Sequence, residues 1–243
     1  MRRASLKQFK KIINEILNEK ETTHSLKRAL YKIIKEIKLY ENYLERKKKW
    51  KNLSVKIDPK KIQIGGGTHI LKDFVNIDII PPANLICDVR EGLPFEDQCS
   101  EFIFCEHFLE HIDYPVSVKK FISECYRVLK LNGQLVIGVP DSEMVIKSYY
   151  KKDLKFYKKI LQTWYSKRNF LPYLNTYIDL VNYHFRDQND DEKYTPHLWA
   201  YDYEKLKSLL KETGFSKVKK WKFDPSIGNP ERKFGTLYMV AIK

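Results

Sequence analysis

Histidine is the side chain of this 243-residue chain best suited to proton transfer, because a neutral imidazole accepts a proton near pH 7. The segment Glu106-His107-Phe108-Leu109-Glu110-His111 carries two histidines, which would share one face at i and i+4 if it were helical. We take this segment as a candidate for general-base chemistry. A capping or packing role for His111 in the following turn is the alternative. Five of the six histidines follow residue 61: His69, His107, His111, His184 and His197.

The same histidine pair raises the question of a metal ion. Two histidines at i and i+4 can ligate zinc, but the zinc-protease pattern is His-Glu-x-x-His. Here the order from Glu106 to His111 is Glu-His-x-x-Glu-His. We therefore expect no metal ion at this segment.

A glycine run and two acidic residues form a second group with chemical potential. Gly65-Gly66-Gly67 directly follows the apolar run Lys61–Ile64, and glycines at the carboxyl end of a strand let a ligand approach the backbone closely. Two later apolar runs end in Asp78 and Asp88, whose carboxylates can accept hydrogen bonds from ribose hydroxyls and an exocyclic amine. A tight turn alone would also explain the glycines, but the acids that follow favour a cofactor crevice.

The elements that would position these groups are those of an α/β fold. After residue 61, short apolar runs alternate with amphipathic segments, which predicts a Rossmann-like, seven-stranded, mostly parallel sheet covered by helices. The predicted helices are Val116–Leu129 and Tyr203–Thr213, the latter ended by Gly214. The predicted strands are Lys61–Ile64, Phe74–Ile77, Leu85–Cys87, Phe102–Cys105, Leu135–Val139, Val218–Phe223 and Leu237–Ile242.

Together these motifs resemble the class I S-adenosylmethionine-dependent methyltransferases, and within them the type-11 branch. The resemblance runs from Lys61 to about Asp141 and returns near His197–Phe215. It rests on the following segments in combination: Ile64-Gly65-Gly66-Gly67, Val75-Asn76-Ile77-Asp78, Cys87-Asp88-Val89, Leu93-Pro94-Phe95-Glu96-Asp97, Phe104 to Ile112, and Arg127 to Gln134.

Two departures from the family pattern have consequences. His69 stands where many members carry a third glycine, and Asp78 lies only 13 positions after the first glycine, Gly65. The dinucleotide-binding pattern has about 20. We therefore expect a short or irregular first helix and no nicotinamide dehydrogenase. A degenerate, non-catalytic relative is the alternative.

The resemblance implies S-adenosyl-L-methionine as the cofactor and a set of site residues. It implies in-line methyl transfer, for which a hydroxyl acceptor needs a base. The catalytic candidates are His107, His111 and His197, and the substrate-binding candidates are His184, Tyr201, Asp141 and Arg168. The cofactor-binding candidates are Ile64, Gly65, Gly66, Gly67, Asp78, Ile79, Asp88, Val89 and Glu106.

A long insertion between the fifth strand and the helix at Tyr203 is expected to form a helical lid over the acceptor. It spans about residues 142–201, far more than an ordinary connection. Ten of the sixteen tyrosines lie between Tyr149 and Tyr203. Aromatic rings with polar tips suit contact with sugar rings or bases, and they equally suit packing of a helical cap.

The net charge of +14 is concentrated at the N-terminus. Residues 1–61 hold 19 Lys and Arg against 7 Asp and Glu, or +12, whereas the remaining 26 against 24 give +2. We predict a basic helical extension over residues 1–53, as a hairpin or coiled coil, and a methyltransferase domain over residues 54–243. From Leu26 to Leu44 the apolar residues recur at alternating intervals of four and three, as in a coiled coil. This apolar stripe could pack on the other N-terminal helix, on the main domain, or on a second copy of the chain in a homodimer. The basic extension could also contact nucleic acid or an anionic membrane.

The hypothesis from sequence is an O-methyltransferase that acts on a sugar, glycan or other small-molecule hydroxyl group. The clamp Asn/Asp-Pro-Pro-Tyr for base amines is not present, and neither is a Pro-Cys nucleophile. The alternatives are a methyltransferase for RNA ribose or protein, and a non-catalytic protein that docks RNA or membranes through the basic helices. No signal peptide is recognisable and the cysteines show no paired spacing, so we expect a cytoplasmic protein, with the inner membrane surface as a peripheral site.

Overall fold

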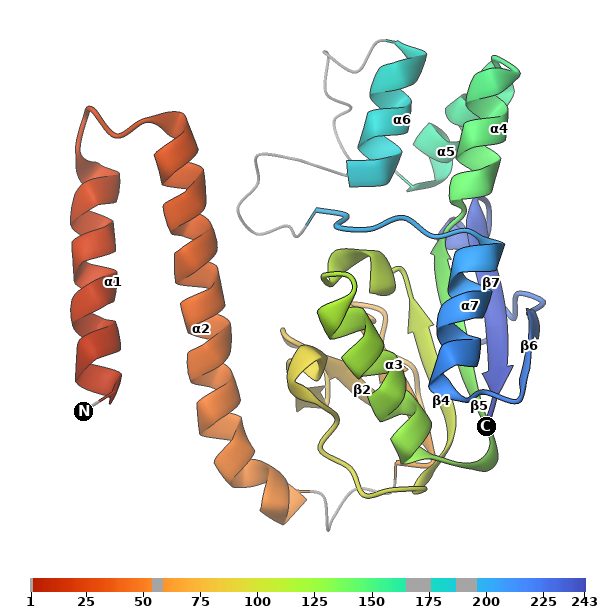
Figure 1. The fold of residues 1–243 in the computed structure, drawn as a ribbon, viewed down its shortest axis with the longest axis horizontal. Helices are drawn as coiled ribbons and strands as arrows, with labels where there is room; N and C mark the ends of the chain where they lie inside the picture. The colour runs from red at the N-terminus through yellow and green to blue at the C-terminus, as the bar shows by residue number, and fades with distance from the viewer. Residues whose placement is uncertain (1, 54–58, 165–175, 187–195) are drawn as a thin grey trace. The chain divides into compact units, whose positions relative to one another are not determined.

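The computed structural model describes residues 2–53, 59–164, 176–186 and 196–243 of the chain, and it divides into two compact units. The first unit is N-terminal and helical and ends at Val55, and the second is the α/β unit, which extends to Lys243. Figure 1 shows the elements of both units.

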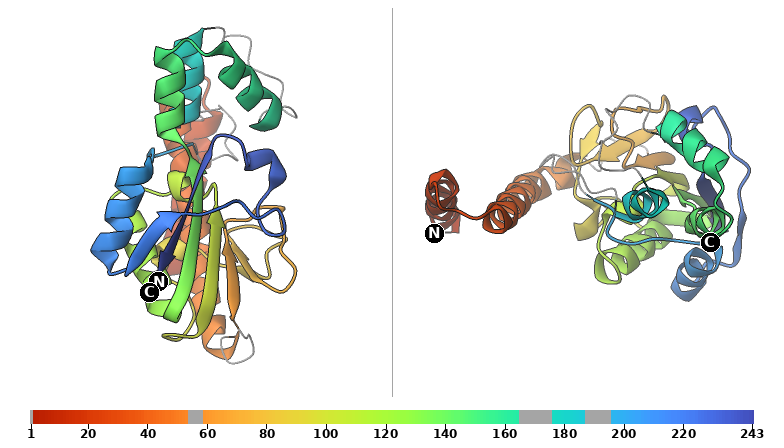
Figure 2. Two further views of the ribbon diagram at one scale, coloured as in Figure 1. Left: turned by 90° about the vertical axis from the view of Figure 1, so that its right-hand side faces the viewer. Right: turned by 90° about the horizontal axis from the view of Figure 1, so that it is seen from above.

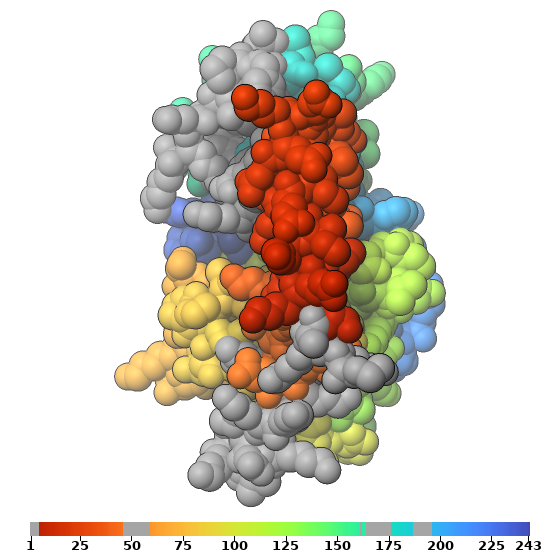
Figure 3. Space-filling view, turned by 90° about the vertical axis from the view of Figure 1, so that its left-hand side faces the viewer, coloured from red at the N-terminus to blue at the C-terminus, as the bar shows by residue number. Residues whose placement is uncertain are grey.

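The N-terminal unit is a pair of antiparallel helices, α1 (Arg2–Asn18) and α2 (His24–Leu53), as Figure 1 shows in red and orange; Figure 3 shows the surface of α1 in red. Ile13 of α1 and Leu30 of α2 are buried, and Lys10 Nζ lies 2.8 Å from a carboxylate oxygen of Glu41. Other apolar side chains stay exposed: Phe9, Ile12, Leu26, Ile33 and Tyr40. No described helix of the chain is long and apolar enough to cross a membrane.

The α/β unit is built on a seven-stranded sheet of order β3-β2-β1-β4-β5-β7-β6, which confirms the predicted fold class. The first five strands in this order are parallel, and β7 is antiparallel to both of its neighbours. The strands are β1 (Lys61–Ile64), β2 (Val75–Asp78), β3 (Leu85–Ile86), β4 (Ser100–Glu106), β5 (Leu129–Pro140), β6 (Lys217–Lys220) and β7 (Thr236–Ile242).

One face of the sheet is covered by two helices, α3 (Val116–Val128) and α7 (Tyr203–Thr213), as the left view of Figure 2 shows. Their amphipathic spacing buries Phe121, Ile122 and Cys125 of α3 and Leu206, Leu209 and Leu210 of α7. Gly214 ends α7 with a φ of 112°, as the sequence predicted.

The opposite face of the sheet is covered by connecting segments. Phe104 and Val136 pack there with Leu71 from the β1–β2 connection, and Trp221 and Ile227 from the β6–β7 connection pack against this cluster. Residues 65–74, all of which are described, form turns and no helix. The first helix, which we expected to be short or irregular, is therefore not formed. Only 10 residues connect β1 to β2, and they must also return the chain to the start of a parallel strand, which leaves too few residues for a helix.

Between β5 and α7 the described residues form three helices, α4 (Ser142–Tyr150), α5 (Leu154–Trp164) and α6 (Tyr177–Arg186). They share a buried cluster of their own, made of Val145, Phe156, Tyr157, Ile160 and Tyr183. This cluster accounts for some of the tyrosines in the segment as packing residues. Arg168 lies outside the described residues.

Candidate active site

The glycine turn after β1 contains two glycines in the left-handed region, Gly65 with a φ of 69° and Gly67 with a φ of 57°. The two differ in their surroundings. A Cβ atom on Gly65 would stand 2.6 Å from the ring of Phe108, whereas one on Gly67 would meet no atom within 4 Å. Gly65 is therefore required by the packing of the protein itself, and Gly67 borders open space.

Asp78 ends β2 and holds this turn through its carboxylate. Oδ2 accepts a hydrogen bond of 2.9 Å from the Gly67 amide, and Oδ1 accepts one of 2.7 Å from Ile79. The Gly65 amide also donates to the Ile77 carbonyl. The carboxylate consequently lies beside the glycine turn, at the edge where the parallel strands end.

Asp88 lies at the same edge of the sheet, because the amide of Cys87 donates to the carbonyl of Asp78 at 2.8 Å. Its side chain begins the 3₁₀ helix η1 (Val89–Glu91) by accepting from the Arg90 amide. Both carboxylate oxygens also accept from the Arg90 guanidinium, at 2.7–3.1 Å. An amine at Asp88 would therefore share the carboxylate with Arg90. Of the flanking cofactor candidates, Ile79 is exposed, whereas Ile64 and Val89 are buried.

Glu106 is the last residue of β4 and is buried, with 4% of its surface exposed. The Tyr238 hydroxyl donates to its Oε1 at 2.7 Å, and the Asn229 amide donates to its Oε2 at 3.2 Å. Burial raises the pKa of the Glu106 carboxyl, against the opposing effect of the Tyr238 hydrogen bond.

His107 follows β4 with a φ of 52°, and its Nε2 lies 2.7 Å from Oγ1 of Thr236. The Thr236 hydroxyl has one hydrogen, which it donates to the Arg232 carbonyl, so the Nε2–H of His107 is the donor to Thr236. In neutral His107 the lone pair is then on Nδ1, which lies 3.7 Å from Oε1 of Glu110. Burial, followed by the nearby Arg232 charge, holds the pKa of His107 well below its usual value, so the ring is neutral at pH 7.

His107 and His111 do not share a helix face, because the segment that carries them is not an α-helix. His107 adopts a left-handed conformation, and only the short 3₁₀ helix η2 (Leu109–His111) follows it, so the two rings do not lie one turn apart on one α-helix. His111 instead packs edge-on against His197, with the ring centroids 4.9 Å apart. The two come together because the amide of Leu198 donates to the Glu110 carbonyl at 2.7 Å.

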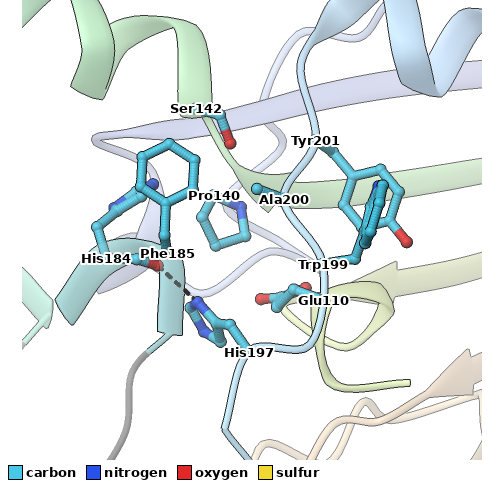
Figure 4. Close-up of a pocket in the computed structure, with 9 residues that line it drawn as sticks. All are labelled: Glu110, Pro140, Ser142, His184, Phe185, His197, Trp199, Ala200 and Tyr201. Carbon is cyan, nitrogen blue, oxygen red and sulfur yellow. Dashed lines mark hydrogen bonds between the residues drawn. The ribbon is translucent and has the colours of Figure 1, made fainter. Parts of the chain in front are cut away.

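A pocket at the ends of β4 and β5 gathers several predicted residues, and Figure 4 shows its lining. His197 and Glu110 point into it, and the Nδ1 atom of His197 lies 2.7 Å from the His184 carbonyl oxygen. His184 is buried, which lowers its pKa to about 3. The lining comprises Glu110, Pro140, Ser142, His184, Phe185, His197, Trp199, Ala200 and Tyr201.

Asp141 and Tyr201 connect this pocket to the sheet. Asp141 caps α4 by accepting from the Met144 amide at 3.1 Å and forms an isolated parallel bridge with Tyr201. The Tyr201 hydroxyl is buried and makes no hydrogen bond to any described residue, and burial raises its pKa. Asp141 is thus engaged by backbone, whereas the Tyr201 hydroxyl keeps its donor and acceptor capacity.

Several residues of the site were not predicted as such. Glu110 was part of the Glu106–His111 motif but was not itself predicted as a site residue. Tyr238, Thr236 and Arg232 come from the C-terminal segment, in which the sequence showed no motif. A signal was present for Glu110, since it stands between two histidines. For the other three the only signal is the return of β7 beside β5, which depends on the tertiary fold.

Part of the chain is similar in sequence to known proteins. Residues 43–137 match the family model of the type-11 methyltransferase domain. Two uncharacterized proteins of Methanocaldococcus jannaschii, MJ1123 and MJ0638, are 33% identical over 102 residues and 30% identical over 107 residues. These matches cover 41% and 40% of this chain and 48% and 46% of the relatives, so the chain spans about half the length of the curated relatives it matches.

Solved structures of S-adenosylmethionine-dependent methyltransferases also align with the chain. One from Methanosarcina mazei is 14% identical, with a TM-score of 0.46, over 79% of this chain and 95% of that one. One from Archaeoglobus fulgidus is 16% identical, with a TM-score of 0.43, over 88% and 100%.

The sheet order and the family match together define the α/β unit as a class I S-adenosylmethionine-dependent methyltransferase domain. Within this class, residues 43–137, less than half of the chain, match the type-11 methyltransferase domain, a family whose cofactor is S-adenosyl-L-methionine.

Proposed function

We propose that this chain transfers the methyl group of S-adenosylmethionine to a hydroxyl group of a sugar, a glycan or another small molecule. The observation that carries the proposal is the neutral imidazole of His107, whose Nδ1 lone pair lies 3.7 Å from Glu110, beside the pocket at the ends of β4 and β5. A base for a hydroxyl proton and a small pocket of about 10 Å³, which would take the acceptor hydroxyl alone, thus share one edge of the sheet.

The glycine turn supports a place for the cofactor at the same edge. Gly67 borders open space that its own Cβ would enter, which permits close approach of a ligand to the backbone. Asp78 Oδ1 accepts from the amides of Ile79 and Ile80, at 2.7 and 3.3 Å, whereas Oδ2 accepts from the Gly67 amide and keeps a second lone pair. Oδ2 of Asp78 would accept a hydrogen bond from a ribose hydroxyl there.

In the reaction, the cofactor supplies a methyl group on a sulfonium: the acceptor oxygen forms a bond to carbon as the carbon–sulfur bond breaks, and sulfur keeps the electron pair. The protein has to align the acceptor and remove its proton. His107 would receive that proton on Nδ1, while its Nε2–H stays bound to Thr236. Tyr201 and His184 would contact the acceptor from the pocket wall.

The test is a transfer assay with radioactive methyl cofactor and the whole chain, with sugar nucleotides and oligosaccharides as one acceptor set and RNA and protein as the other. We expect label in the sugar set, in an alkali-stable ether linkage, and loss of transfer in Asp78→Ala. Transfer to RNA or protein alone would contradict the choice of acceptor. Transfer at the wild-type rate in Asp78→Ala would contradict the cofactor site.

The +12 charge of residues 1–61 favours a second candidate function, methylation of RNA ribose. Basic residues that neutralise phosphates give binding that weakens steeply with salt. Filter binding of a single-stranded RNA to the whole chain between 50 and 300 mM KCl distinguishes the candidates, because a steep slope together with transfer to RNA supports the second candidate and salt-independent weak binding supports the first.

A further inference from the structure

We propose that Glu110, His111 and His197 form a binding site for one divalent transition-metal ion. One ligand atom from each residue, a carboxylate oxygen and two imidazole nitrogens, lies within 4.8 Å of the other two. The three come from two segments far apart in the sequence, which the fold brings together at the ends of β4 and β5 (Figure 4 shows Glu110 and His197).

The backbone holds the two segments in this arrangement. Glu110 and His111 are consecutive in η2, and the Glu110 carbonyl accepts from the Leu198 amide at 2.7 Å. The His197 amide in turn donates to the Arg186 carbonyl at 2.8 Å. The residue that carries the third ligand is therefore anchored on both sides, by η2 and by the end of α6.

The tautomer of His197 identifies Nε2 as the nitrogen that would bind the ion. Nδ1 lies 2.7 Å from the carbonyl oxygen of His184, and a carbonyl can only accept, so Nδ1 carries the hydrogen. In neutral His197 the lone pair is then on Nε2. Histidine ligands of metal ions are commonly held in this way, by a hydrogen bond from the nitrogen that does not bind the ion.

The donor set selects the class of ion. Two imidazoles and one carboxylate are the protein ligands of many catalytic zinc sites and of non-haem iron sites, whereas magnesium and calcium prefer oxygen ligands alone. Bonds of about 2.0–2.2 Å at angles of about 90–109° place ligand atoms roughly 3.0–3.4 Å apart. Side-chain rotations that bring the atoms about 1.5 Å closer would therefore complete the site.

Three protein ligands leave at least one coordination position open, and it would face the pocket that Tyr201 and Ser142 line. This role rests on the proposed function: a hydroxyl of the acceptor would bind the open position, and the ion would lower the pKa of that hydroxyl next to Nδ1 of His107. Metal binding itself does not depend on the identity of the acceptor.

The experiment is a titration of the untagged, chelator-treated whole chain with Zn²⁺ by calorimetry and with Co²⁺ by visible absorption. We expect one ion per chain, a Co²⁺ spectrum typical of nitrogen and oxygen ligands, and a rise in the melting temperature with the ion. His197→Gln, His111→Gln and Glu110→Gln should each weaken binding by about 100-fold or more, because loss of a direct ligand should cost at least as much as the roughly 10–100-fold lost with an outer-shell partner. His69→Gln is the matched control and should bind as the wild type does, because His69 contacts the Ile227 carbonyl and not the triad.

Two results would overturn the site: no binding tighter than about 1 mM, or equal binding by the wild type and all three ligand variants. Circular dichroism of each variant identifies those that fold, and any one folded variant suffices for the comparison. Full transfer by chelator-treated protein would overturn the role of the ion in transfer while leaving the proposed function intact. Metal binding without any methyl transfer would support the site and count against the proposed function.

Discussion

Replacing Gly65 with alanine should destabilise the protein far more than the same change at Gly67, although the two glycines stand in one turn. Both have positive φ, so alanine costs about 1–2 kcal/mol at either position. At Gly65 the new Cβ also stands 2.6 Å from the Phe108 ring, which packs edge-on against Phe121 at 5.3 Å. Overpacking of this kind adds about 1–3 kcal/mol. We therefore expect a loss of about 2–5 kcal/mol for Gly65→Ala and about 1–2 kcal/mol for Gly67→Ala.

Urea unfolding of the two variants measures these losses, and the double variant Gly65→Ala/Phe108→Ala isolates the collision. The combined loss should be smaller than the sum of the two single losses, because Phe108→Ala removes the atoms that the new Cβ meets. Cofactor affinity should show the opposite order: Gly67→Ala should weaken binding at least about tenfold, since its Cβ enters the space through which a ligand approaches. Equal unfolding free energies for the two variants, or wild-type cofactor affinity in Gly67→Ala, would refute this reasoning.

Three further variants test other parts of the site and its support. His107→Asn keeps a residue type that tolerates positive φ, so transfer should fall by about 10²–10⁴-fold with cofactor affinity within a few-fold, and wild-type turnover would remove His107 from the chemistry. Hydrogen bonds from Arg127 lower the pKa of Glu124, which is also bonded to the Leu93 amide, so Glu124→Gln should lose about 1–2 kcal/mol at pH 7 in urea unfolding. The stability that Glu124 contributes is present above the unfolded-state pKa of its carboxyl and is lost as the pH falls through the lowered folded-state pKa. The difference in unfolding free energy between Glu124→Gln and wild type should therefore disappear in acid. A difference that stays constant with pH would contradict this role of Glu124. Tyr238→Phe deprives buried Glu106 of a hydrogen bond and should lower the unfolding free energy by about 1–3 kcal/mol, whereas an unchanged urea midpoint would contradict that role for Tyr238.

Local sequence was sufficient for most of the sheet. Strand β1 and helix α7 begin and end at the predicted residues. The apolar run before the glycines sets the bounds of β1, and Gly214 sets the end of α7. Strand β5 is longer than predicted, since Leu129 and Gln134 both pair with β4, on either side of a register shift. At β6 the prediction extended too far, because Trp221 turns to pack on Phe104 across the sheet instead of continuing the strand.

Fewer of the contacts in the candidate site could be predicted from the sequence. The proximity of Asp78 to the glycine turn could be predicted, because both follow neighbouring parallel strands. The pairing of His111 with His197 could not, because it requires residues 197–201 to return across the end of β4 and beside Asp141. The i and i+4 spacing suggested His107 as the neighbour of His111, but this holds only in a helix, and His107 has a left-handed backbone conformation.

Calorimetric titration of the whole chain with S-adenosylhomocysteine, comparing wild type, Asp78→Ala and Asp97→Ala, tests the central claim most directly. Asp97 is the control, since it is exposed before the amino end of β4 and pairs with Arg127 there. Loss of one charge-assisted hydrogen bond, worth about 1.5–3 kcal/mol, predicts a Kd about 10–10²-fold higher for Asp78→Ala and unchanged for Asp97→Ala. Wild-type affinity in folded Asp78→Ala would contradict a cofactor site at the glycine turn.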